Sequence, residues 1–234
     1  MVNKYKWILL IIILITGLIT GCRRGEEEEL PEKIQENQRT EIKALIKDPS
    51  NWVHFREDFF KELLEHRIYV DSRLSYENFY HGIDYRLMME EEAVVDLFGS
   101  PNTREEDPFA YRMYVLEYDG LIIQINDYDH GAYATGYYIR SPEFSGPRGT
   151  YVGQSVGEVL IAFPLPEKEE VFMEPGQIYW GEETEFYGAH MAGMHLLEDG
   201  EITEVRYAEG SGFAGVVFEI FEGVVQSIYF FEMN

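Results

Sequence analysis

The sequence predicts an α+β fold in which N-terminal helices are followed by two units, each a helix plus an antiparallel β-meander. Three observations predict it. Apolar residues recur at helical spacing from Asn51 to His66. Two later segments align when the sequence is shifted by 65 residues. Turn dipeptides then separate strand-like stretches after each aligned segment.

Residues 1–21 have the organisation of a cleavable export signal. Lys4 and Lys6 precede Trp7–Ile19, an apolar run that is short beside the ~20 residues of a membrane span. The run then meets Ile-Thr-Gly-Cys22, which resembles the lipobox of bacterial lipoproteins. The resemblance implies that Cys22 is lipidated and that the signal is cut before it. The alternative is an uncleaved anchor, and either would place the body on the extracytoplasmic face of the bacterial cell membrane.

An acidic tether and a helical segment follow. Residues 22–30 include Glu26–Glu29, a like-charge run that extends by self-repulsion. Residues 31–80 are expected to be mainly helical. Within them the better helix is Asn51–His66, whose apolar stripe is more often core than a ligand site. The stripe consists of Phe55, Phe59, Phe60, Leu63 and Leu64.

The first α+β repeat is expected over residues 81–147 and the second over residues 148–234. The helix of the second repeat is predicted to begin at Ser155, which can form a capping box with Glu158. The helix of the first repeat begins instead with Glu90, Glu91 and Glu92, and acidic residues are favourable at the positive N-terminal end of a helix dipole. Gly99 and Pro164 end the two helices. The aligned pairs are Leu87 with Val152, Val94 with Val159, Val95 with Leu160, Phe98 with Phe163, and Pro101 with Pro166.

Each helix is followed by predicted strands. Three dipeptides, Asp119-Gly120, Asp199-Gly200 and Glu222-Gly223, mark tight hairpin turns. Ser141–Arg148 contains two prolines and a glycine and forms the joint between the units. The predicted strands are Arg112–Tyr118, Leu121–Asp127, Ala134–Arg140, Gly193–Leu197, Ile202–Tyr207, Gly215–Phe221 and Val224–Glu232.

The segment Val152–Val159, with Phe163 and Pro166 downstream and a meander after it, resembles the repeats of the BamE and β-lactamase-inhibitory-protein superfamily. Similar tandem units, preceded by Arg-Gly as in Arg148-Gly149, occur in extracytoplasmic lipoproteins of Gram-positive bacteria. The resemblance covers roughly Gly82 to Asn234. It implies a helix-on-sheet fold and a non-catalytic, protein-binding role. The first copy departs from the motif, having Met-Met-Glu in place of Gly-x-Ser.

Charge and cysteine content exclude several functions. The formal net charge of −24 repels phosphate backbones and anionic headgroups, so nucleic acid is not an expected partner. The acidity serves solubility, with a cationic partner as the sharper alternative. One cysteine allows no internal disulfide, and because Cys22 is committed to lipid, no thiol nucleophile remains.

The sequence predicts no metal site and no cofactor. His190 and His195 could converge with Glu183 or Glu185, but they lack the spacing of a metal motif. The acidic run at 126–129 lacks the later ligands of an EF-hand loop. No phosphate-binding or dinucleotide fingerprint occurs.

No catalytic residue is assigned either. The stretch Glu209–Gly212 lacks the spacing of a nucleophile elbow. Carboxylate pairs such as Glu117 with Asp119, or Glu219 with Glu222, are expected by chance among 43 acids. A group of strand aromatics would form a binding surface if exposed, although strand propensity alone explains them. They are Tyr133, Tyr137, Tyr138, Tyr187, Tyr229, Phe230 and Phe231.

The sequence therefore predicts a lipid-anchored extracytoplasmic protein that is not an enzyme. It would be held to the membrane through Cys22 and would bind another protein of the cell envelope. The alternative is an envelope hydrolase or cell-wall-modifying enzyme that uses carboxylates, which would need a concave pocket with convergent titratable groups.

Overall fold

The computed structural model describes residues 44, 48–54, 76–106, 112–163, 171–174, 177–183, 190–208 and 213–232. The chain divides into two compact units, Met1–Glu41 and Ile42–Asn234, and the described residues belong to the second. The predicted signal, Cys22 and the acidic tether lie outside the described residues, as does most of the N-terminal helical segment.

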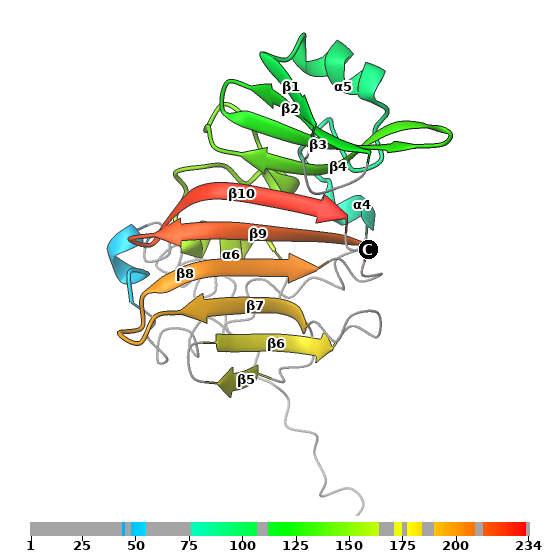
Figure 1. The fold of residues 1–234 in the computed structure, drawn as a ribbon. Helices are drawn as coiled ribbons and strands as arrows, with labels where there is room; N and C mark the ends of the chain where they lie inside the picture. Colours follow the sequence, from blue (N-terminus) through cyan, green and yellow to red (C-terminus); the bar gives the residue numbers. More distant parts are fainter. Residues whose placement is uncertain are drawn as a thin grey trace, which may run out of the picture. The chain divides into compact units, whose positions relative to one another are not determined.

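The described strands form one antiparallel sheet of ten strands in the order β1-β2-β3-β4-β10-β9-β8-β7-β6-β5 (Figure 1). The last strand of the chain therefore lies at the centre, where Tyr229 of β10 pairs with Tyr138 of β4. The strands are β1 (Thr103–Glu106), β2 (Met113–Tyr118), β3 (Leu121–Tyr128), β4 (Gly131–Ile139), β5 (Val171–Glu174), β6 (Gln177–Glu183), β7 (His190–Leu196), β8 (Ile202–Ala208), β9 (Ala214–Phe221) and β10 (Val224–Glu232).

The predicted α+β class and all three predicted hairpins are confirmed. Tyr118 pairs with Leu121 across the first turn, and Phe221 pairs with Val224 across the last. Glu222 and Gly223 both have positive φ, 51° and 73°, as a two-residue turn matched to strand twist requires. The sequence did not predict β1, β5 and β6.

The described helices are short. They are α4 (Tyr76–Phe79), α5 (Glu91–Phe98) and α6 (Val156–Ala162), with single 3₁₀ turns η1 (Pro49–Asn51) and η2 (Pro147–Gly149). The predicted capping box opens α6, since the Ser155 hydroxyl accepts from Glu158 N at 3.3 Å and Ser155 N donates to the Glu158 carboxylate at 2.9 Å. Figure 1 shows α6 behind the sheet.

The segment before each longer helix is hydrogen-bonded to a central strand. Met88 N donates to the Ala134 carbonyl of β4 at 2.7 Å, and Gly153 N donates to the Val225 carbonyl of β10 at 2.8 Å. Met88 and Gly153 both have positive φ, 62° and 97°. The two helices are thus attached to adjacent strands in the middle of the sheet.

The hydrophobic core lies between the helices and the sheet. Val94 of α5 and Val159 of α6 are fully buried. Tyr137 of β4 stacks on Phe230 of β10, with ring centroids 4.8 Å apart. The ring of Phe163, at the end of α6, stacks on the ring of Tyr207 in β8, with centroids 4.5 Å apart. Aromatic packing of this kind adds roughly 0.5–1.5 kcal/mol per pair beyond the burial of area.

Arg148 anchors the segment between β4 and α6. Its guanidinium donates to the Asn78 carbonyl in α4 at 3.1 Å and to the Ala162 carbonyl at the end of α6. A cation at a helix C-terminus is favourable because the terminal carbonyls lack intrahelical donors. Arg148 therefore ties η2 to the ends of two helices.

The predicted helix over Asn51–His66 does not begin at Asn51. The Asp48 carboxylate accepts from Ser50 N at 3.0 Å and closes a single 3₁₀ turn, after which Trp52 is buried at 3% exposure. His54 then forms a β-bridge with Glu201. Residues 48–54, which we call the strap, lie against the β9–β10 turn at Gly223 and the β7–β8 turn at Glu201. Residues 55–66 fall outside the described part of the chain.

Candidate functional site: the open face of the sheet

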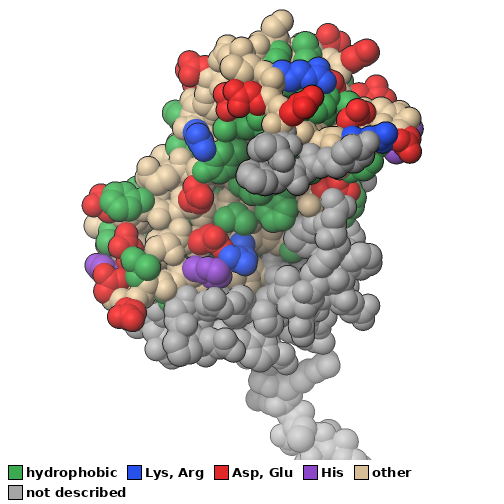
Figure 2. Space-filling model, viewed as in Figure 1, with side chains coloured by type: hydrophobic (Ala, Val, Ile, Leu, Met, Phe, Trp, Pro, Cys, Tyr) green, Lys and Arg blue, Asp and Glu red, His purple; other side chains and the backbone are tan. Residues whose placement is uncertain are grey.

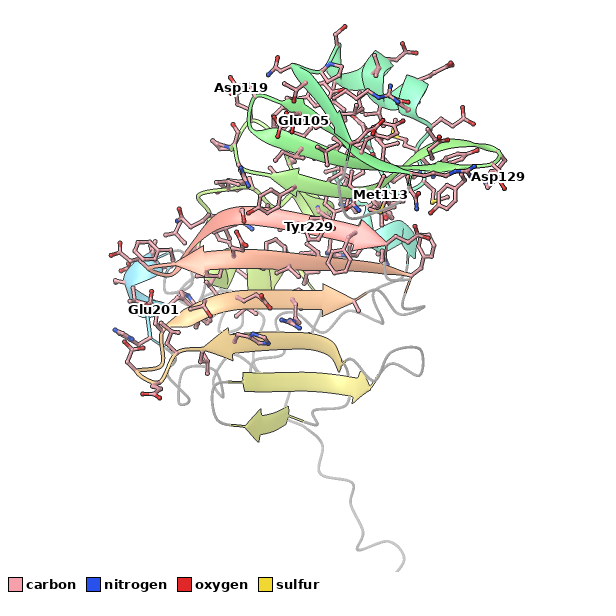
Figure 3. The ribbon with its side chains drawn as sticks, in the orientation of Figure 1. Glu105, Met113, Asp119, Asp129, Glu201 and Tyr229 are labelled. Atoms are coloured by element: carbon pink, nitrogen blue, oxygen red, sulfur yellow. The ribbon has the colours of Figure 1, made fainter. Side chains whose placement is uncertain are left out.

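One side of the sheet carries the described helices, and the other side carries a mixed aromatic and charged surface, which we call the open face. The burial pattern of β3 alternates along the strand, as expected when only one face is covered. The open face lies toward the viewer in Figures 2 and 3. Its side chains are Val115, Glu117, Ile122, Gln124, Tyr138, His195, Glu204, Arg206, Val217, Glu219, Tyr229 and Phe231.

Strand register aligns six of these residues in one row across the sheet. The row runs through β2, β3, β4, β10, β9 and β8. Five steps of ~4.8 Å between neighbouring strands give a row about 24 Å long. It has an acid at one end, a base at the other and two tyrosines at the centre. In order the residues are Glu117, Ile122, Tyr138, Tyr229, Val217 and Arg206.

The aromatic centre of the open face is fixed by its neighbours. Tyr229 stacks on Phe231 with ring centroids 4.8 Å apart, and it meets Tyr138 edge-on at 6.0 Å. The Tyr229 hydroxyl donates to the Gln124 side chain at 3.1 Å. A Cβ at Gly136 would lie only 3.1 Å from the Tyr229 ring, so glycine makes room for it. Burial raises the pKa of Tyr229 above its ordinary value.

Two carboxylates stand opposite each other beside the aromatic centre. Glu204 of β8 pairs in register with Glu219 of β9, and directly opposed side chains lie about 5 Å apart at Cβ. Glu219 accepts from the Tyr138 hydroxyl at 2.8 Å and from the Ser227 hydroxyl. Glu204 accepts from the Arg206 guanidinium through Nε at 2.8 Å and through a second nitrogen. The Arg206 guanidinium compensates the charge of Glu204, whereas the hydroxyl donors to Glu219 are neutral.

His195 extends the polar group onto β7. Its Nδ1 lies 3.8 Å from the Glu204 carboxylate. Burial lowers the pKa of His195, the Arg206 guanidinium lowers it further, and Glu204 opposes both effects. Nε2 is buried and has no hydrogen-bond partner among the described residues. His195 therefore favours its neutral form.

The open face already holds two arginine side chains of the chain itself. The Arg140 guanidinium lies over the Tyr138 ring, 4.5 Å from the ring centroid. Arg206 binds Glu204 through two nitrogens, as described above, and its side chain remains 42% exposed. Both contacts use chemistry suited to cations, a ring face in one and a carboxylate in the other.

The histidines and acids considered for a metal are not gathered into a site within the described residues. No group of three or more potential ligands occurs among them. Register places Glu183 opposite His190, while His195 lies near Glu204 instead; Glu185 lies outside the described residues. In the acidic run, Asp129 sits in the turn after β3 and pairs with Arg112 at 2.5 Å.

The two carboxylate pairs named from the sequence are distributed differently. Glu117 lies on the open face and accepts from the Thr103 hydroxyl at 3.0 Å, whereas Asp119 is in the turn that follows β2. Glu219 is in β9 and Glu222 in the next turn. The facing pair is Glu204 with Glu219, which the sequence reasoning missed. Alternation of Glu204 and Arg206 with buried Val205 and Tyr207 was the available signal. Residues 209–212 lie outside the described residues.

The strand aromatics divide between the two faces. Tyr137 and Phe230 are fully buried in the core, while Tyr138, Tyr229 and Phe231 are half-buried on the open face. Tyr133 lies near the β3–β4 turn, with its ring 5.4 Å from His130, and Tyr187 is outside the described residues. Of the five in β4 and β10 other than Tyr133, two face the core and three face the open side, which agrees with strand alternation.

Comparisons with known proteins identify no family. No protein-family model matches the chain, and no curated protein matches it. Among solved structures it is similar to an extracellular protein containing a SCP domain from Bacillus anthracis str. Ames, with 13% sequence identity and a TM-score of 0.36. The match covers 69% of this chain and 47% of that one, so it spans about half of the other protein. A likeness at this level assigns neither a family nor an activity.

Within the described part of the chain, no helix is both long and apolar enough to cross a membrane. The predicted signal and its apolar run lie outside that part. Lipidation of Cys22 therefore stays a prediction.

Proposed function

We propose that this protein is a lipid-anchored, extracytoplasmic binding module that holds a protein of the cell envelope on the open face of its sheet. The open face carries the proposal. It combines a fixed aromatic centre with hydrogen-bonding side chains on either side, and interface centres are enriched in aromatic residues and arginine. The lipid anchor rests on the lipobox resemblance at Cys22.

The polar groups of the open face favour binding over catalysis. The Glu219 carboxylate accepts two hydroxyl donors and Glu204 accepts a two-nitrogen arginine contact. Their side chains are therefore held in place by neighbours within the chain. A rigid, pre-organised surface binds with a smaller loss of side-chain entropy.

The facing pair of Glu204 and Glu219 supports the second candidate, a hydrolase that uses carboxylates. Such an enzyme needs one carboxyl to give a proton and the other to stay ionised. Under this reading Glu204→Gln or Glu219→Gln would abolish turnover of cell-wall fragments. Under the binding proposal no turnover is measured in the parent protein or in either variant.

We further infer that the two α+β units are tandem repeats. The two helix-entry hydrogen bonds described above involve Met88 and Gly153, which are related by the 65-residue shift of the sequence alignment. The return bonds match at their helix-entry ends, because Ala134 N donates to Met89 O and Val225 N donates to Gln154 O, each at 2.9 Å, and Met89 and Gln154 are also 65 residues apart. Matching backbone bonds and matching positive φ support a common ancestral unit. The BamE-like assignment of that unit remains a prediction.

A photo-crosslinking experiment tests the binding proposal. The photoreactive residue replaces Val217 at the half-buried middle of the open face, or Leu97, which is 45% exposed on α5, on the other side of the sheet. Irradiation of living cells should give a discrete crosslinked species from position 217 and none from position 97. The same species from both positions, or none from position 217, would refute the open face as the binding surface.

A further inference from the structure

The open face combines exposed acid with aromatic rings on a strongly acidic chain. Glu219 is exposed and accepts from the Tyr138 hydroxyl, while Glu117 is half-buried in the cross-strand row, where Ile122 lies between it and Tyr138. The chain carries a net charge of −24. A field of this sign attracts cations over a distance of about 10 Å at 0.1 M salt and repels anionic surfaces.

From these observations we infer that the partner held on the open face presents a basic segment, with arginine or lysine side chains that meet its tyrosines and glutamates. The inference rests on the proposed binding function and adds the chemistry of the partner. Charge complementarity is one argument for it. The other is that Arg140 on the Tyr138 ring and Arg206 on Glu204 show how this face accommodates guanidinium groups.

Two acceptors on the face differ from Glu204 in having no arginine partner among the described residues. Within that part of the chain, Glu219 receives hydroxyl donors from Tyr138 and Ser227, and Glu117 receives the Thr103 hydroxyl. Each of these bonds uses one oxygen, Oε2, and leaves the charge of the carboxylate uncompensated. A basic side chain from a partner would supply that compensation at each position.

Register sets the spacing that a partner segment must match. Glu117 lies on β2 and Glu219 on β9, four strand spacings apart across the sheet (~19 Å) and two residues apart along the strands (~7 Å), which together give ~20 Å. An extended segment rises ~3.3 Å per residue, so basic residues about six positions apart would reach both acids. The rings of Tyr138 and Tyr229 lie between them on β4 and β10.

Peptide binding to the detergent-solubilised full chain tests the inference. The probes are a fluorescein-labelled peptide of alternating Arg and Ala, a matched peptide of alternating Glu and Ala, and the neutral glycan chitohexaose. Affinity is measured by fluorescence anisotropy for the peptides and by calorimetry for the glycan, at low and moderate salt. We expect the Arg-Ala peptide to bind, more weakly as salt rises, and the Glu-Ala peptide not to bind.

The test variant is Glu117→Gln with Glu219→Gln. Its matched control is Glu92→Gln with Asp96→Asn, which removes the same charge from exposed positions of α5 on the other side of the sheet. Loss of two exposed ion pairs should weaken Arg-Ala binding about 2- to 30-fold in the test variant. The control variant should retain the parent affinity. Tyr229→Ser should weaken binding a further ~2- to 5-fold through loss of the ring.

Each remaining outcome overturns the inference. Equal weakening in the test and control variants would show a response to net charge alone. Failure of the Arg-Ala peptide to bind the parent chain would exclude a basic partner. If chitohexaose binds instead and Tyr229→Ser abolishes that binding, the open face remains a binding surface for another class of ligand. Crosslinking from position 217 separately decides whether the proposed function holds. Circular dichroism of every variant checks that it folds.

Discussion

Substitution of Gly223 by alanine should detach the strap from the sheet. Gly223 has φ 73°, and a Cβ at this position would lie 2.6 Å from the Pro49 carbonyl oxygen and 3.2 Å from both the Trp52 carbonyl carbon and the Val53 backbone nitrogen. None of these contacts can be relieved by a side-chain rotation, because all involve backbone. We expect the strap, residues 48–54, to move away and to expose Trp52, now 3% exposed.

The magnitude has two parts. Positive φ costs an L-residue roughly 1–2 kcal/mol. Loss of Trp52 burial adds up to about 3–5 kcal/mol, the range for removal of a buried aromatic ring. Gly149→Ala is the matched control, since its φ is 71° and its added Cβ would meet no atom within 4 Å. The control should therefore lose only the roughly 1–2 kcal/mol of backbone strain.

Urea unfolding followed by tryptophan fluorescence measures both losses. Gly223→Ala should show the larger fall in the free energy of unfolding and a red-shifted native emission, because Trp52 becomes solvated. Equal losses in the two variants, with unchanged native emission, would refute the assignment of the strap to the β9–β10 hairpin.

Four further predictions concern single residues. Ser155→Ala should destabilise the protein by about 1 kcal/mol through loss of the α6 cap, and an unchanged urea midpoint would argue against the capping box. Arg148→Ala should cost about 1.5–3 kcal/mol because two carbonyls at helix ends lose a charged donor; a loss below about 0.5 kcal/mol, typical of a neutral surface change, would contradict this role. Burial, and to a lesser extent the Arg206 guanidinium, lower the pKa of His195 below its ordinary value of 6.5 in the folded state. The unfolded chain therefore binds a proton more readily, and stability is lost as the pH falls below 6.5. His195→Gln should lose less stability between pH 7.5 and 5.5 than the parent, and identical losses would remove His195 from the explanation. Cys22→Ser should block labelling by an alkynyl fatty acid, and a labelled variant would end the lipoprotein assignment.

Local signals predicted the parts of the fold that short segments determine. The Glu222-Gly223 turn and the Ser155 cap were correctly predicted because each depends on backbone preferences within a few residues. Strand β1 was missed, since Thr-Arg-Glu-Glu has no apolar alternation and all four residues are exposed. The helix expected from Asn51 was wrong at its start, where the Asp48 side chain stabilises a single 3₁₀ turn.

Pairings between distant strands could not be read from the sequence. The pairing of β4 with β10 joins strands β1–β4 to strands β5–β10 in one sheet, and Tyr137 and Phe230 stack on each other in the core beneath it. The candidate site also depends on pairings between strands that are distant in the sequence. Glu204 faces Glu219 through β8–β9 register, and Tyr138 reaches Glu219 across β10. Alternation alone assigns each side chain to a face but does not say which strand lies beside it.

The opposed glutamates connect the stability of the sheet to its proposed role. Like charges directly opposite on neighbouring strands destabilise a sheet, and the net charge of −24 adds to that repulsion. Arg206 compensates Glu204, but the donors to Glu219 among the described residues are the neutral hydroxyls of Tyr138 and Ser227. A basic side chain bound at Glu219 would relieve repulsion that the free protein retains. Ligand binding to the folded state must then raise the unfolding midpoint, and this increase should shrink as salt screens the pair.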